Sequence, residues 1–299
     1  MSSERFRLQQ LVLAGTAVPG GQSYTIDRQR QVQALAQDGS RYEQSHVVPQ
    51  AEPIAEIESL NLGWIFGSAA PWNASLDVPI ALLSGAGLVL YGAKEAANVP
   101  GFDPAAQHTS HTIGAGVMHL ARLSWAKGGS AVASLRCLAK SANGETDPII
   151  RATNVAAAAL PNSVTTTHDW VVTAATLGAA AIDLESVDIE FDPALIQSYS
   201  AGLPQPTDVI GSGAPVVISL SGTTFNLRGV DGAGACTLVL RQRSHGGGLQ
   251  APTLTLTFYG THVWEEGVSG PTGGPRERSF RVTNRHDGTN RPMTWALSA

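Results

Sequence analysis

Short runs in which apolar and hydroxyl residues alternate are the feature that most constrains the fold of this chain. The clearest is residues 253–258, where Leu254, Leu256 and Phe258 alternate with threonine. This period of two is typical of a β-strand with one buried face. Similar runs occur at residues 131–138, 164–172, 215–220, 237–241, 280–283 and 293–297. We therefore expect a mainly β fold, a β-sandwich or barrel with long loops.

Turn signals separate these runs, and helix signals are few. The turn signals are pairs that tolerate the positive φ angles of tight hairpins: Asp38-Gly39, Asn143-Gly144, Ser221-Gly222, Asp231-Gly232 and Asp287-Gly288. At most one or two short helices are predicted, at residues 54–62 and 82–98, and three glycines weaken the second. Long loops are predicted at residues 92–114, 198–214 and 260–275. No repeat at a fixed period is evident.

The length of 299 residues is near the size at which single cores stop growing, so one elaborated domain or two packed halves are both possible. We expect residues 1–130 to form an N-terminal arm, the first strands and a long loop, which can belong to the same domain as the rest. Residues 131–299 are expected to form a β-sandwich core with a C-terminal hairpin. The apolar run at residues 11–14 is too short for a membrane span.

Charged residues make up only 14% of the chain, against about 25% in an ordinary soluble domain. Subunit interfaces, whose centres are depleted of charge, would account for this. The net charge of −5 argues against general binding to nucleic acid, which usually needs a basic surface. Cys137 and Cys236 lie far apart in apolar runs, so we expect buried free thiols and no disulfide framework.

The most informative segment is an acidic one, IDLESVDIEFD at residues 182–192. Carboxylates alternate with apolar residues, and the phase slips by one at Ser186-Val187, as a β-bulge would produce. We consider three interpretations: a solvated sheet face, an acidic metal site, or a channel wall that repels phosphate and lets DNA slide. No Lys or Arg occurs between Arg151 and Arg228, so the nearby sequence offers no partners for these five carboxylates: Asp183, Glu185, Asp188, Glu190 and Asp192.

Motifs of catalysis are missing from the sequence. There is no G-x-S-x-G, no phosphate-binding glycine loop, no C-x-x-C and no H-E-x-x-H. Three histidines could approach one metal ion, but separate surface or core positions are the favoured interpretation: His108, His111 and His119. His168-Asp169 resembles part of a triad, but adjacent strand residues face opposite ways. Glu265-Glu266 is expected to be solvated loop charge. We therefore assign no catalytic, cofactor or metal residues and no cofactor.

The C-terminal segment RVTNRHDGTNRPMTW, residues 281–295, resembles the final hairpin of the tail tube proteins of long-tailed (siphovirus-type) bacteriophages. In that family a strand, a D-G-T-N-x-P turn and a closing strand end the chain. Two other regions are similar in style. One is residues 131–160, with the turn NGETDP at 143–148, and the other is the acidic segment followed by a Gly/Pro loop and the strand at 216–220.

This resemblance implies a β-sandwich whose inner sheet joins those of its neighbours into a continuous barrel. It implies hexameric rings that stack into a tail tube, a conduit for DNA that is not bound specifically. Partners would be other copies and the tape measure, terminator and distal tail proteins, and the location would be the virion, after synthesis in the host cytoplasm. It also implies that the five carboxylates of the acidic segment are candidates to face the lumen, and that the chain is not an enzyme.

Other functional classes remain open at this point. A jelly-roll or fibre-type module could use the long loops to bind a receptor or carbohydrate on the host surface. A capsid-decorating or other virion structural protein is another alternative. A β-rich hydrolase with an irregular site, for example at His119 or Asp169, would escape a search for motifs.

Overall fold

A computed structural model describes the backbone of twelve segments of the chain, and it places most of them in β-strands. The described segments are residues 4–35, 45–67, 72–73, 77–92, 108–156, 169–213, 216–224, 235–244, 246–259, 261–269, 277–284 and 290–298. Among them one helix occurs, α1 (Leu62–Ile65), whose first turn is capped by the side chain of Asn61. The predicted mainly β fold is confirmed, and all strand pairs are antiparallel, as in a sandwich-type fold.

The largest sheet has 15 strands. Its main path runs in the order β13 (Ile149–Val155), β10 (His108–Ile113), β9 (Leu88–Gly92), β1 (Glu4–Leu13), β3 (Gly21–Asp27), β6 (Ile54–Ser59), β12 (Val132–Ala139), β11 (Gly116–Ala126), β16 (Leu184–Asp192), β19 (Val217–Thr224), β23 (Glu277–Asn284) and β22 (Thr261–Ser269). Three short strands attach beside this path: β2 (Thr16–Val18), β7 (Trp72–Asn73) and β8 (Ile80–Leu83).

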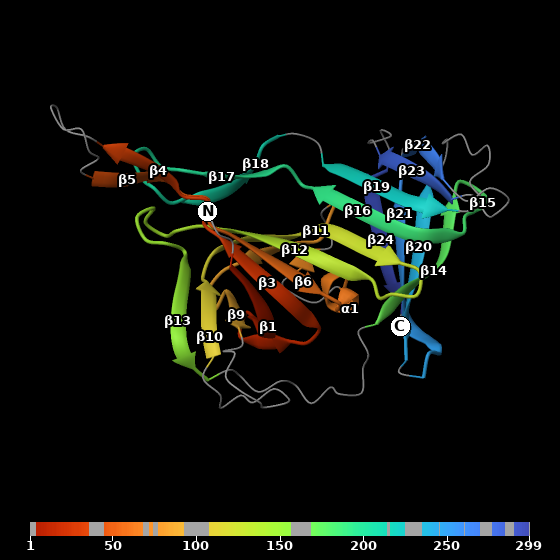
Figure 1. Ribbon diagram of the computed structural model, residues 1–299, viewed down its shortest axis with the longest axis horizontal. Coiled ribbons are helices and arrows are strands. Elements are labelled where there is room, and N and C mark those ends of the chain that lie inside the picture. The colour runs from red at the N-terminus through yellow and green to blue at the C-terminus, as the bar shows by residue number, and fades with distance from the viewer. Residues whose placement is uncertain are drawn as a thin grey trace.

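A second sheet has five strands, and two separate hairpins project from the body of the molecule (Figure 1). The sheet has the order β15 (Ala180–Ala181), β14 (Trp170–Leu177), β20 (Cys236–Arg243), β21 (Leu249–Phe258) and β24 (Met293–Ser298). The hairpins are β4 (Gln31–Leu35) with β5 (Ser45–Gln50), and β17 (Leu195–Ser198) with β18 (Asp208–Gly211). In Figure 1 the strands β14, β20, β21 and β24 run steeply across β16 and β19.

The same pattern of strand pairing occurs twice along the chain. In the first unit, which ends with β13, β1 pairs with β2 and β9, β9 with β10, and β10 with β13. In the second unit, which begins with β14, β14 pairs with β15 and β20, β20 with β21, and β21 with β24. Each unit also has an inner row of four strands, β3-β6-β12-β11 in the first and β16-β19-β23-β22 in the second. The hairpins β4–β5 and β17–β18 occupy the same place in chain order.

Pairing of β11 with β16 joins the two inner rows into one run of strands. One hydrophobic core extends through both units, and its largest fully buried side chains include Tyr24, Trp170, Phe258 and Phe280. The two cysteines are free and buried in this core, as predicted, and burial raises the pKa of each thiol to about 12. The expected division at residue 130 falls in the turn between the paired strands β11 and β12.

Several local predictions are confirmed and others are wrong. Strands occupy the described parts of all seven predicted runs. The helices predicted at residues 54–62 and 82–98 are replaced in their described parts mainly by β6, β8 and β9, and only α1 is helical. Strands β10, β18 and β22 lie inside the three segments predicted as loops. Ser221-Gly222 is no turn but lies within β19, whereas Gly144 does have the positive φ of a turn, at 74°.

The predicted C-terminal hairpin is also wrong. Strand β23 pairs with β19 and β22 in the large sheet, whereas β24 pairs with β21 at the edge of the five-stranded sheet. The two last strands therefore belong to different sheets. The predicted turn pairs at Asp38, Asp231 and Asp287 lie outside the described residues.

Candidate functional site

The acidic segment forms β16, at the centre of the run that joins the two units. Val187, Ile189 and Phe191 are buried, and Glu190 and Asp192 are exposed on the opposite face, so the predicted alternation is confirmed. The register against β19 shifts between Leu184 and Ser186, next to the position where the sequence phase slips. The bulge allows both halves of the segment to present carboxylates to solvent.

Partners for three of these carboxylates come from β11 and the turn after it, and not from the neighbouring sequence. Arg122 Nε donates to Asp188 Oδ1 at 2.6 Å, and a second guanidinium nitrogen donates to Oδ2. This hydrogen bonding raises the pKa of Arg122. Lys127 Nζ lies 2.5 Å from Glu185 and 3.7 Å from Asp183. An exposed pair such as Arg122–Asp188 contributes only about 0–1 kcal/mol to stability, so its main effect is to reduce the negative charge of the face.

Polar residues continue from β16 across the neighbouring strands, and we call this surface the polar face. Because cross-strand neighbours point the same way, the register defines rows of side chains. One row passes through seven strands in the order Ser23, Glu58, Ser134, Arg122, Glu190, Ser219 and Thr283. A second row contains Thr25, Glu56, Arg136 and His119. Both units therefore contribute to one hydrophilic surface.

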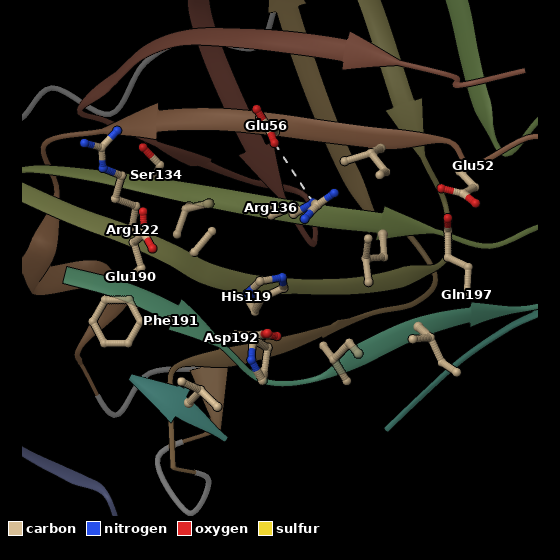
Figure 2. Close-up of a pocket in the computed structure, with 18 of the residues that line it drawn as sticks. Glu52, Glu56, His119, Arg122, Ser134, Arg136, Glu190, Phe191, Asp192 and Gln197 are labelled. Carbon is tan, nitrogen blue, oxygen red and sulfur yellow. Dashed lines mark ion pairs between the residues drawn. The ribbon is translucent and has the colours of Figure 1, made fainter. Parts of the chain in front are cut away.

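A groove of about 910 Å³ follows this face (Figure 2). Its lining includes five carboxylates, Glu52, Glu56, Glu58, Glu190 and Asp192, against three guanidinium groups, Arg122, Arg136 and Arg281. The charged groups that line the groove therefore have a moderate excess of negative charge. Figure 2 shows Arg136 between Glu56 and His119. The Nε of Arg136 lies 4.0 Å from Glu56 Oε1, which makes an ion pair.

His119 is the buried titratable group of the groove. It is 5% exposed, its Nδ1 donates to the carbonyl oxygen of Leu120 at 3.0 Å, and Asp192 lies beside it in Figure 2. Desolvation lowers the pKa of His119 from its ordinary value of 6.5, although the backbone hydrogen bond acts the other way. Burial therefore favours the neutral imidazole, which adds no positive charge to the polar face.

The other two histidines of the predicted group, His108 and His111, have separate structural roles. His111 Nδ1 lies 3.1 Å from the hydroxyl oxygen of Tyr24, whose pKa is raised by burial. His108 packs edge-to-face against Tyr91. Among the residues that the structure describes, no group of three or more His, Cys, Asp or Glu could hold a metal ion, so neither the histidines nor the acidic strand form such a group.

The two remaining candidate pairs from the sequence are His168-Asp169 and Glu265-Glu266. Asp169 accepts a hydrogen bond from Arg243 Nε at 2.6 Å. Burial raises the pKa of Asp169, but hydrogen bonds from Ser130 and Arg243 outweigh it and hold the pKa below its ordinary value. His168 lies outside the described residues. Glu265 and Glu266 belong to β22 rather than to a loop, and their side chains are outside the described set.

Residues of the polar face outside the acidic segment were not predicted. The sequence IAEIES of β6 does contain the signal, because Glu56 and Glu58 alternate with buried Ile57 and Ser59. The contributions of Arg122 and Arg136 could not be found from local sequence, since they depend on pairing between distant strands. No helix in the described part of the chain is long and apolar enough to cross a membrane.

No model of a known protein family matches this chain, and no curated protein matches it at a significant level. The polar face and the strand pairing are therefore the basis for the function proposed below.

Proposed function

We propose that the chain is a non-enzymatic structural subunit that assembles into rings around a channel, and that the rings stack into the tail tube of a long-tailed bacteriophage. The observation that carries this proposal is the polar face. A continuous run of inner strands buries one side in the core and presents hydroxyl groups and an excess of carboxylates on the other. A channel for DNA needs a wall with this character.

The electrostatic argument concerns how tightly such a wall would hold a duplex. A basic surface binds DNA by releasing counterions, and the bound duplex would not slide. The polar face has the opposite balance, because five carboxylates face three guanidinium groups in the groove. Arg122 and Lys127 reduce this charge at Asp188 and Glu185, so repulsion is moderate. The wall would keep phosphates away from contact without closing the channel to DNA.

The sheet edge supports assembly. Strand β22 ends the main path of the large sheet, and β23 is its only neighbour within the described segments. Exposed strand edges pair readily with other chains, and proteins usually cover them. Val268 in β22 is 51% exposed. Pairing of β22 with another copy would satisfy the edge and bury this side chain.

In this role the partners are other copies of the chain, stacked rings, and the tape measure, terminator and distal tail proteins at the ends of the tube. DNA passes through without specific binding. The protein is made in the host cytoplasm and functions in the virion. The resemblance at residues 281–295 supports this assignment by its sequence, although β23 and β24 pair in different sheets and not with each other as expected.

Negative-stain electron microscopy of the purified protein, over a range of concentrations, tests the proposal. We expect rings or short tubes with a central hole. Compact particles without a hole at every concentration would contradict it.

The groove itself favours a second candidate, recognition of a receptor or carbohydrate, because its volume is in the range of ligand sites. Among the lining residues, however, only Phe191 and Tyr199 are aromatic, and Phe191 is buried. Sugar-binding sites usually need exposed rings, so charge governs this groove more than stacking. Calorimetric titration with bacterial surface oligosaccharides would support this candidate if it gave saturable binding by a monomer.

A further inference from the structure

The two units correspond residue by residue in their inner rows. In β3, the register against β6 shifts between Gly21 and Ser23, and in β16 the register against β19 shifts between Leu184 and Ser186. The bulge therefore lies at the same place in both strands, and Ser23 corresponds to Ser186. The hydroxyl group of each serine forms a hydrogen bond with the side chain of the opposite residue, Ser23 with Glu58 and Ser186 with Thr223.

The strand pairs at the other end of the inner rows, β11 with β12 and β22 with β23, correspond in the same way. The register of β11 against β12 shifts between Leu120 and Arg122, and the register of β22 against β23 shifts between Glu265 and Gly267. Aligning these bulges matches Leu123 with Val268. It also matches Ser124 with Ser269. The correspondence holds in the adjoining pairs, since Leu135 faces Ile57 as Phe280 faces Gly222.

Among the described strands, β11 has a second neighbour and the corresponding strand β22 does not. Strand β11 pairs with β16 of the second unit, where Leu123 lies opposite Ile189 and is 2% exposed. Strand β22 presents the same edge at the end of the sheet, and Val268 is 51% exposed. The β11–β16 junction inside the chain is therefore a paired counterpart of the edge that β22 presents.

The strand that corresponds to β16 is β3, and its outer edge is covered from within the chain. Residues 4–7 of β1 pair with residues 23–26 of β3 in the antiparallel direction. At the internal junction, residues 123–126 of β11 pair with residues 186–189 of β16 in the same direction and at the corresponding positions. Residues 4–7 therefore occupy the place that β11 fills at the internal junction.

We propose that β22 of one copy pairs with β3 of the next copy and displaces residues 4–7, repeating the β11–β16 junction between chains. The internal register then sets three opposed pairs: Gly267 with Asp27, Val268 with Ile26, and Ser269 with Thr25. The exchange replaces one set of backbone hydrogen bonds by another and adds burial of Val268. The junction is head-to-tail, so it can close into a ring.

The inference rests on the proposed function for the number of units. The family resemblance implies six sandwich units in a ring, and each copy of this chain supplies two units. A closed ring then contains three chains, and its inner surface alternates between β11–β16 junctions within chains and β22–β3 junctions between them.

Cysteine crosslinking tests the junction and the copy number together. A variant with Thr25→Cys and Ser269→Cys is treated with a short bis-maleimide after assembly, because opposed residues have Cβ atoms only about 5 Å apart. The native cysteines are buried, so we do not expect them to react. On denaturing gels we expect a ladder that stops at three chains. A matched control carries Thr25→Cys with Thr294→Cys, an exposed residue of β24, and should not crosslink.

The outcomes of this experiment distinguish failure of the junction from failure of the proposed function. Rings visible by electron microscopy without crosslinking would overturn the junction but leave the ring-forming function intact. A ladder that stops at six chains would overturn the three-chain ring and retain the junction. Absence of both rings and crosslinks would contradict the proposed function and the inference together.

Discussion

Leu123 and Val268 occupy corresponding positions in the two units, but Leu123 is 2% exposed at the β11–β16 junction and Val268 is 51% exposed at the end of the sheet. The difference in exposure has a simple cause, because β11 pairs with β16 beside Leu123, whereas β22 has β23 as its one neighbour among the described strands. Assembly is expected to remove the difference.

Val268→Lys should therefore prevent assembly while the monomer remains folded. A lysine at this position would place its charge in the junction that buries Leu123 in the first unit, and unpaired charges on edge strands block pairing. We expect the concentration at half-assembly, measured by sedimentation velocity, to rise at least about tenfold, which corresponds to roughly 1.4 kcal/mol. The matched control is Leu249→Lys, at an exposed residue of β21 that is 48% accessible. Equal assembly of the two variants would remove Val268 from the interface.

Removal of residues 1–7 should promote assembly. These residues include the segment that covers the edge of β3, and a strand that must be displaced slows the association of copies. We expect faster ring formation by light scattering at the same protein concentration. Slower or absent assembly in the truncated protein would show that residues 4–7 form part of the assembled sheet.

The carboxylates of the polar face should keep DNA from binding. Glu190 and Asp192 are exposed and lie in the groove, so replacing both by lysine reverses its charge balance. We expect assembled wild-type protein to retain no duplex DNA in filter binding at low salt, and the double variant to retain it in a salt-dependent manner. Glu145→Lys, in an exposed turn, is the control. DNA retention by that control equal to the double variant would remove the special role of the groove.

His119 should make stability depend on pH on the acid side. Its pKa is lowered in the folded protein, so the unfolded chain binds more protons between that pKa and 6.5. The free energy of unfolding should therefore fall as the pH decreases below about 6.5. The free energy of unfolding, measured with urea between pH 5 and pH 7.5, should change less with pH for His119→Gln than for the wild type. Identical slopes would contradict the burial of a neutral imidazole.

Gly222 should be intolerant of a side chain because of its neighbours on β16 and β23. A Cβ atom there would lie 2.4 Å from the carbonyl oxygen of Ser186 and 3.1 Å from the ring of Phe280. We expect Gly222→Ala to lower the free energy of unfolding by about 1–3 kcal/mol. Gly211→Ala is the control, since a Cβ atom added at Gly211 would meet no other atom within 4 Å. A loss no larger than that of the control would show that β19 can shift.

Sequence patterns predicted the strands well because burial on one face imposes a period of two, as in β16 and β21. The same pattern was present at Ile54–Ser59, where Ile57 between two glutamates marks a strand, but helix was predicted there. The partners of the acidic strand could not be predicted, because Arg122 reaches Asp188 only through pairing of strands that are distant in sequence.

The repeated architecture left no fixed period for physical reasons. Corresponding positions share their place in the strand pairing and not their residue type, so Leu135 matches Phe280 and Ile57 matches Gly222. Loop lengths also differ between the units, and the spacing between corresponding residues changes along the chain. Strand pairing reveals the repeat because hydrogen-bond register, including the bulges, depends on the backbone and not on side-chain identity.

A cryo-electron microscopy reconstruction of the assembled protein would show the proposed junction itself. We expect a closed ring in which the sheet continues from β22 of one copy into β3 of the next, with the polar face toward the hole and three chains supplying six units. A protein that remains monomeric at high concentration, with residues 4–7 still paired to β3 and Val268 still exposed, would contradict it.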